Sequence, residues 1–135
     1  MSMNDYKFFF SLIVLILSPS GNLEADTLKI LQMLSIEDDL KIEVFLENIE
    51  TPRQITQSQA GNIFVGSKNG GVINAIFPDK SVRVIAKDLK YATGVAFQDG
   101  DLYFSEIESI WKIENIDEQL VQSSGIPEKI LVTNN

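Results

Sequence analysis

Hydrophobic and polar residues alternate along most of the chain from residue 41 onward. In residues 41–46, for example, Ile42, Val44 and Leu46 lie on one side of an extended chain, and the intervening residues lie on the other. Alternation with a period of two predicts β-strands. Further stretches of this kind follow, each bounded by turn residues. They are residues 53–57, 62–67, 72–77, 81–86, 93–97, 101–106, 109–114 and 129–133.

The second half of these stretches repeats the first half at a spacing of roughly 40 residues. Gly61 corresponds to Gly100 in this repeat, and Phe64 corresponds to Tyr103. A repeat of this length with four strands is typical of β-propeller blades. The sequence therefore predicts an all-β chain, with two four-stranded antiparallel blades of a propeller over residues 51–135. Two blades do not close a propeller ring.

Two details of the second predicted blade are specific enough to check. We place Trp111 in the third strand, at the position that Ile73 holds in the first blade, and expect it to pack between the blades. We expect a long loop over residues 115–127, between the third strand and the outer strand.

The chain begins with a short polar segment, followed by an apolar block over residues 8–17 and a break at residues 18–21. This order is typical of a secretory signal, and ten apolar residues are too few to span a bilayer as a helix. We predict a signal helix within residues 1–25, with cleavage after Ser20 or Ala25. Export would place the protein in the periplasm or outside the cell, with no membrane span after cleavage. The alternative is a buried strand or helix of the domain.

Residues 26–50 form a mixed segment before the predicted blades. Asp26 and Thr27 are suited to cap a short helix that ends at Leu34. The strand at residues 41–46 resembles the N-terminal strand with which propellers often complete their last blade. The acidic residues 37–39 are interpreted as a solvated loop rather than a cation site.

Composition excludes several classes of function. The formal net charge is -8, so nucleic acid and anionic membrane surfaces are poor partners. The chain contains no Cys, which excludes disulfides and thiolate chemistry, and no His, which removes the commonest general base and metal ligand.

The candidate binding residues lie where the inner strands begin, because propeller ligands usually sit near the ring axis. They are Arg53, Gln54 and Thr93. Arg53 is suited to pair with an anionic ligand, and its alternative role is to bond neighbouring loop carbonyls. We predict no metal site, and we interpret Asp99-Gly100-Asp101 as a hairpin turn rather than part of a calcium loop.

Two segments of the chain resemble the N-terminal part of the glucose/sorbosone dehydrogenase family. One is PRQ followed by GNIFVGS within residues 52–67, and the other is GVAFQDGDLYFSEI followed by IWKI within residues 94–113. The resemblance covers about residues 36–135. It implies an exported six-bladed β-propeller that uses pyrroloquinoline quinone (PQQ), commonly with calcium, to oxidise sugars.

The resemblance also implies what this chain lacks. The family carries its catalytic His after the outer strand of the second blade, and this sequence has no His. Thr93 stands where the family often carries an Asn. We therefore expect the N-terminal fragment of a PQQ-dependent sugar dehydrogenase, inactive alone and binding no cofactor by itself. The alternatives are an exported propeller-type binding module and a fragment of a lactonase-like or NHL-like propeller.

Two blades without neighbours leave apolar faces and strand edges open. We predict that the isolated chain is marginally stable and self-associates through its open strand edges. Thermal unfolding combined with light scattering checks this expectation. A monomer that unfolds cooperatively above about 60 °C, within the range of complete domains, would contradict it.

Overall fold

The computed structural model describes residues 12–13, 29–30, 32–34 and 42–134 of the chain. These residues belong to two compact units, Met1–Ile49 and Glu50–Asn135. The second unit carries the predicted repeat.

In the first unit, strand β1 (Leu12–Ile13) pairs in parallel with strand β2 (Ile42–Glu43). The predicted signal helix is therefore wrong at residues 12 and 13, because short apolar runs fit a strand as well as a helix. The rest of that segment, with both cleavage positions, lies outside the described residues. The strand predicted over residues 41–46 is reduced to β2, and residues 44–49 have no regular structure.

Helical structure is also present in the first unit, at residues 29–30 and 32–33. These residues fall within the helix predicted to end at Leu34. Within the described ranges, the helices are too short or too polar to reach across a lipid bilayer.

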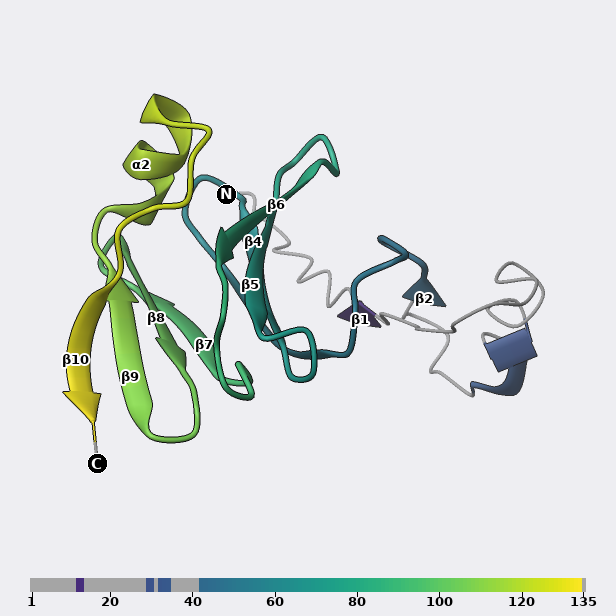
Figure 1. Cartoon of the computed structure of the whole chain (residues 1–135). Coiled ribbons are helices and arrows are strands. Elements are labelled where there is room, and N and C mark those ends of the chain that lie inside the picture. Colours follow the sequence, from purple (N-terminus) through teal and green to yellow (C-terminus); the bar gives the residue numbers. More distant parts are fainter. Residues whose placement is uncertain (1–11, 14–28, 31, 35–41, 135) are drawn as a thin grey trace, which may run out of the picture. The chain divides into compact units, whose positions relative to one another are not determined.

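The second unit consists of two four-stranded antiparallel sheets and a short helix (Figure 1). The strand orders are β3-β4-β5-β6 and β10-β9-β8-β7, so each sheet is a simple meander. The all-β prediction is confirmed, and each predicted strand of the repeat is present. The strands are β3 (Pro52–Gln57), β4 (Ile63–Ser67), β5 (Val72–Ile76), β6 (Val82–Ala86), β7 (Val95–Gln98), β8 (Asp101–Ser105), β9 (Ser109–Ile113) and β10 (Ile130–Asn134).

Strand register confirms that Phe64 and Tyr103 are equivalent. Each lies three residues after its turn glycine and faces one residue of the inner strand and one of the third strand. These are Thr56 and Ala75 for Phe64, and Ala96 and Lys112 for Tyr103. The same register corrects the expected position of Trp111.

Trp111 pairs with Phe104 as Asn74 pairs with Val65, so Trp111 is equivalent to Asn74 and not to Ile73. The residue equivalent to Ile73 is Ile110. The cause is the length of the hairpin connection. The connection between β8 and β9 is shorter than the one between β4 and β5, which comprises residues 68–71. Trp111 still packs against the buried core, as predicted.

The equivalent positions define two faces of each sheet. Face A carries Ile55, Ile63, Val65 and Ile76 in the first sheet, and Val95, Leu102, Phe104 and Ile113 in the second. Face B carries Thr56, Phe64, Ile73 and Ala75 in the first sheet, and Ala96, Tyr103, Ile110 and Lys112 in the second.

The core of the second unit forms where face B of the first sheet packs on face A of the second. One buried cluster contains Phe64, Ile73 and Ala75 from the first sheet together with Leu102, Phe104 and Ile113 from the second. The innermost strands β3 and β7 are neighbours at this interface. Two bonds link them, because Gln54 Oε1 and Thr56 Oγ1 accept hydrogen bonds from the backbone N–H groups of Val95 and Phe97 at 3.3 and 3.2 Å.

Helix α2 (Ile116–Gln122) lies in the segment that we predicted as a loop, so that prediction is wrong. Ile116 and Leu120 are four residues apart, face the same side of the helix and are buried in the core. Asp117 and Glu118 favour the helix by their position in its first turn. A helix of this length gains its stability from packing rather than from intrinsic propensity.

Both ends of α2 bind the first sheet. Asp117 accepts hydrogen bonds from Ser58 Oγ and Asn62 Nδ2, both at 2.7 Å, and from the backbone N–H of Ala60 at 3.3 Å. At the other end, Arg83 donates to the carbonyls of Leu120 and Ser123 at 2.9 and 2.7 Å. Arg83 thereby satisfies carbonyls that the helix C-terminus leaves unpaired.

We expect Asp117→Ala to lower the free energy of unfolding by about 2–3 kcal/mol, because it leaves partly buried donors without their charged acceptor. Urea denaturation of the purified chain measures this. The matched control is Glu118→Ala, in the same helical turn but exposed. Equal effects of the two substitutions would show that the Asp117 contacts do not stabilise the fold.

Candidate ligand site

The predicted binding residues lie at one end of the two sheets. Strand β3 begins at this end and β4 finishes there, since Pro52 pairs with Ser67. In the second sheet, β7 begins and β8 finishes in the same way, with Val95 opposite Phe104. The link over residues 87–94 connects the two sheets at this end.

The three predicted residues have different surroundings. The amide oxygen of Gln54 is occupied by the N–H of Val95, so Gln54 serves to join the inner strands. Arg53 is exposed and has no hydrogen-bond or ion-pair partner among the described residues. Thr93 is half-buried, and its carbonyl oxygen lies 3.0 Å from the point where a Cβ on Gly66 would stand. Gly66 is therefore needed for the close approach of the two backbones.

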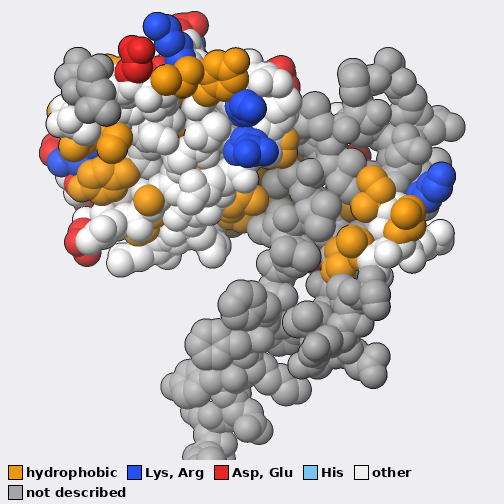
Figure 2. Space-filling view, turned by 90° about the horizontal axis from the view of Figure 1, so that it is seen from below, with side chains coloured by type: hydrophobic (Ala, Val, Ile, Leu, Met, Phe, Trp, Pro, Cys, Tyr) orange, Lys and Arg blue, Asp and Glu red, His pale blue; other side chains and the backbone are white. Residues whose placement is uncertain are grey.

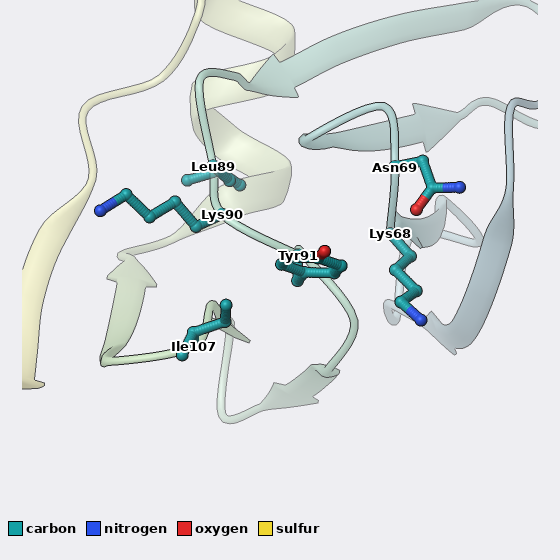
Figure 3. A pocket seen from close by; sticks show the side chains of 6 residues that line it. All are labelled: Lys68, Asn69, Leu89, Lys90, Tyr91 and Ile107. Carbon is teal, nitrogen blue, oxygen red and sulfur yellow. The ribbon is translucent and has the colours of Figure 1, made fainter.

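A pocket of about 320 Å³ lies at the same end. Its walls come from the β4–β5 hairpin, the link between the sheets and the β8–β9 turn (Figure 3). The lining residues are Lys68, Asn69, Leu89, Lys90, Tyr91 and Ile107. Sequence reasoning missed all of them.

Tyr91 is the central side chain of this pocket. It is 51% exposed, and its φ of 57° is in the left-handed region, which is unfavourable for a bulky residue. Thr51, forty residues earlier, has the same unusual conformation with a φ of 39°. The repeat therefore includes backbone strain as well as strand pattern, and such strain often occurs at functional positions.

Two lysines line the pocket, but their ammonium groups do not point toward a common position for an anion. The ammonium group of Lys68 lies 5.5 Å from the Tyr91 ring centroid. Figure 3 shows Tyr91 between Lys68 and Lys90, whose ammonium groups point to opposite sides. Neither lysine forms an ion pair with a carboxylate among the described residues. The arrangement suits weak attraction of an anionic molecule to an open surface rather than its enclosure.

Glu106 is not a lining residue, but it forms hydrogen bonds that hold the pocket wall in place. Its carboxylate accepts a hydrogen bond from the backbone N–H of Lys90 and another from the indole N–H of Trp111, both at 2.8 Å. The bond from Lys90 is the main cause that lowers the pKa of Glu106 below the usual 4.5. The bond from Trp111 and the positive charges of Lys129 and Lys90 act in the same direction, while burial opposes them.

The described residues offer binding groups, and the sequence limits the chemistry that they could perform. They contain no group of three or more His, Cys, Asp or Glu side chains arranged to hold a metal ion. The whole sequence lacks both His and Cys. General acid–base chemistry would therefore depend on carboxylates, Lys or Tyr, and none of these forms a mutually bonded pair at the pocket.

We expect acid to weaken the contact of Glu106 with Trp111. A carboxylate with a lowered folded-state pKa stabilises the fold above its ordinary pKa and loses this contribution as the pH falls through the lowered value. The fluorescence of Trp111, the single tryptophan, should therefore change with a midpoint below pH 4.5. Glu106→Gln should remove that change.

The control for this experiment is Glu108→Gln, because Glu108 is exposed and two residues away. This variant should keep the acid transition of the wild type. An unaltered transition in Glu106→Gln would show that another group is responsible.

Comparison with known proteins finds a similar protein, but it does not show a family. The chain is 38% identical over 98 residues to an uncharacterised protein of Borreliella burgdorferi. The match covers 70% of this chain and 25% of that protein, so the chain spans about a quarter of the length of the curated relative it matches. No family model matches the chain. No solved structure matches it either.

Proposed function

We propose that the two sheets are consecutive blades of a β-propeller of the glucose/sorbosone dehydrogenase type. In this proposal the chain is the N-terminal fragment of an exported, PQQ-dependent sugar dehydrogenase. It supplies part of the scaffold around the cofactor and is not a catalyst by itself.

The observation that carries the proposal is the packing of face B of the first sheet on face A of the second. Each sheet uses a different face, so the arrangement is head-to-tail. The inner strands β3 and β7 lie next to each other, as neighbouring blades require around an axis. A head-to-tail interface repeated with a constant rotation gives a ring where the rotation closes and an open filament where it does not. Propellers are built by such radial repetition of four-stranded sheets.

The resemblance and the relative support the same proposal. The quoted segments fall on β3–β4 and on β7–β9, which are the strands that repeat. The matched part is a quarter of the Borreliella burgdorferi protein, and the other three quarters are long enough for further blades.

The residues at the inner-strand ends fit part of the proposed cofactor. PQQ carries carboxylates, and the exposed cations Arg53, Lys68 and Lys90 lie at this end without ion pairs to carboxylates among the described residues. PQQ, when bound in a complete enzyme, accepts the electrons of the sugar. Calcium does not fit here, because the described residues offer no group of acidic ligands. The fragment thus contributes charge near the cofactor but not a complete site.

A binding module is the second candidate. It is favoured by the exposed apolar side chains of strand β10, Ile130, Leu131 and Val132, which are 44%, 43% and 51% exposed. Strand β10 is an edge strand of its sheet, and an open edge can pair with a strand of another protein.

Calorimetric titration of the full chain with PQQ and calcium tests the role of the fragment. We expect no binding tighter than about 10 μM and no oxidation of sugars by the chain alone. Tighter binding that is lost in Arg53→Ala would contradict the scaffold role and assign a cofactor site to the fragment.

The enzyme class is tested on the Borreliella burgdorferi protein. Loaded with PQQ and calcium, it should reduce a dye acceptor when sugars are added. Removal of PQQ should abolish this activity. Lactone hydrolysis without PQQ would instead favour the lactonase-like alternative, and absence of both activities would contradict the dehydrogenase proposal.

A further inference from the structure

The β4–β5 hairpin carries a chemically labile pair of residues. Asn69 is followed by Gly70, and no other Asn in the sequence precedes a Gly. The carboxamide carbon of an Asn can be attacked by the backbone nitrogen of the next residue, and a Gly in that place has no side chain to hinder the attack. Asn69 is exposed, so solvent reaches this pair. The hairpin therefore combines the residues and the exposure that deamidation needs.

The hairpin leaves both reacting groups without hydrogen bonds. Neither the carboxamide of Asn69 nor the N–H of Gly70 has a partner among the described residues. In contrast, the backbone N–H of Asn69 donates to Thr51 Oγ1 at 3.0 Å. The N–H of Gly71 donates to the carbonyl of Ser67 at 3.1 Å. The electrophile and the nucleophile are thus the unpaired groups of an otherwise hydrogen-bonded turn.

Packing keeps a Gly at position 70. A Cβ on Gly70 would meet Oγ of Ser67, which is fully buried and donates a hydrogen bond to the carbonyl of Glu50. A residue with a side chain would have to displace this buried hydroxyl group or distort the turn. The fold therefore retains the neighbour that makes Asn69 reactive.

Three other Asn residues of the second unit lack this combination. Asn62 and Asn74 are 7% and 6% exposed, and the residues that follow them belong to strands β4 and β5. Asn115 is exposed, but the N–H of Ile116, which would have to attack it, donates to the carbonyl of Gly100 at 2.9 Å. These three positions provide comparisons within the same chain.

We propose that Asn69 deamidates spontaneously and that the product attracts anions to the pocket less strongly. The backbone nitrogen of Gly70 loses its proton to a solvent base and bonds to Cγ of Asn69. The Cγ–Nδ2 bond breaks, and the amide nitrogen takes up a proton and leaves as ammonia. Water then opens the succinimide ring at either carbonyl carbon, which gives Asp or isoaspartate. The chain has then taken up a water molecule and released ammonia, without oxidation or reduction.

Both products place a carboxylate beside Lys68. Lys68 and Asn69 are neighbours in the sequence and line the same pocket (Figure 3). Figure 2 views the chain from below Figure 1 and shows Lys and Arg side chains at the surface of this end. A negative charge a few ångströms from an ammonium group offsets its field, because opposite charges at this distance attract even in a high dielectric. The pocket thereby loses part of its attraction for an anion.

Isoaspartate also lengthens the backbone by a carbon atom. The hairpin is fixed at Gly71, whose carbonyl accepts a hydrogen bond from the N–H of Leu89 at 3.0 Å. A Cβ on Gly71 would lie 2.6 Å from the carbonyl oxygen of Leu89, so the hairpin has no room to shift toward the link between the sheets. The additional atom is therefore expected to displace the part of the pocket wall that Lys68 and Asn69 form.

Mass spectrometry of the full chain tests the reaction. The chain is incubated at neutral pH in heavy-oxygen water, which marks the residues that deamidate during the incubation. Trypsin then releases residues 69–80, because Lys68 and Lys80 provide its cleavage positions, and Asn74 within this peptide serves as an internal comparison. We expect Asn69 to react at least about tenfold faster than Asn74, a difference of about 1.4 kcal/mol in barrier height.

A parallel incubation in urea tests the contribution of the folded hairpin. Unfolding should change the rate at Asn69 by less than about tenfold, because its reacting groups are already free in the folded chain. The rate at Asn74 should rise by more than this factor, because Asn74 is buried within strand β5.

Two variants separate the charge of the product from the reaction. Asn69→Asp carries this charge from the start. Asn69→Gln is the matched control, because it keeps a neutral carboxamide and its longer side chain closes the corresponding ring less readily. Circular dichroism checks that both variants are folded. If Asn69→Asp is unfolded, wild-type chain that has deamidated during incubation is separated by anion exchange and used in its place.

Amide NMR during a titration with inorganic phosphate measures the attraction for anions. Phosphate binding at Lys68 and Tyr91 should be about threefold weaker in Asn69→Asp than in the wild type, as expected for a unit charge about 6 Å away in water. Binding by Asn69→Gln should equal that of the wild type.

Three results would overturn the inference. They are a rate at Asn69 no higher than at Asn74, a rate at Asn69 that rises more than about tenfold in urea, and equal phosphate binding by the wild type and Asn69→Asp. The second result would show that the folded hairpin protects Asn69. Since these assays contain neither PQQ nor sugar, their outcome is independent of the tests of the dehydrogenase proposal.

Discussion

The packing of one sheet on the other is the interaction on which the rest of the second unit depends. Neither meander encloses a core by itself, because a single sheet buries apolar side chains only against another layer. Phe64 of the first sheet and Phe104 of the second are almost completely buried in the shared cluster. The two sheets are therefore expected to fold and unfold as one cooperative structure, although they derive from two copies of a repeat.

Polar contacts then determine how the sheets are oriented on each other. Apolar packing has no preferred direction. The hydrogen bonds that Asp117 accepts and Arg83 donates require a particular geometry. These contacts hold both ends of α2 against the first sheet. Because α2 connects strands β9 and β10 of the second sheet, the contacts link the two sheets. The ligand-site end has its own link through Gln54. The pocket walls come from both sheets, so their geometry depends on these links.

The sequence predicted the strands well, because their alternation and turn glycines are local signals. Gly61 and Gly100 have positive φ angles, as expected for turns between strands. Helix α2 was missed because its helical periodicity rests on a single pair, Ile116 and Leu120. In an element of seven residues, one pair is too weak a signal to predict a helix. The error in placing Trp111 has a different cause. The spacing of residues in the sequence does not reveal that the second hairpin is shorter. Only the strand pairing in the structure shows it.

The candidate site was predictable only in part. The inner-strand starts were placed at one end from topology alone, and Arg53 is exposed there without an ion pair among the described residues. The contact of Gln54 with Val95 depends on how close two strands lie, which no local pattern encodes. Tyr91 was missed because its left-handed backbone has no glycine to mark it. Such a conformation results from the surrounding packing rather than from the residue itself.

Glu106 shows how one carboxylate links two of the segments that form the pocket wall. Glu106 precedes Ile107 of the pocket wall, and its carboxylate accepts a hydrogen bond from the backbone N–H of Lys90. The two hydrogen bonds that it accepts stabilise its charged form and lower its pKa. A carboxylate with a lowered pKa is a weaker base at neutral pH, since proton transfer to it is less favourable. The same two bonds therefore hold the β8–β9 turn against the link between the sheets and lower the basicity of Glu106.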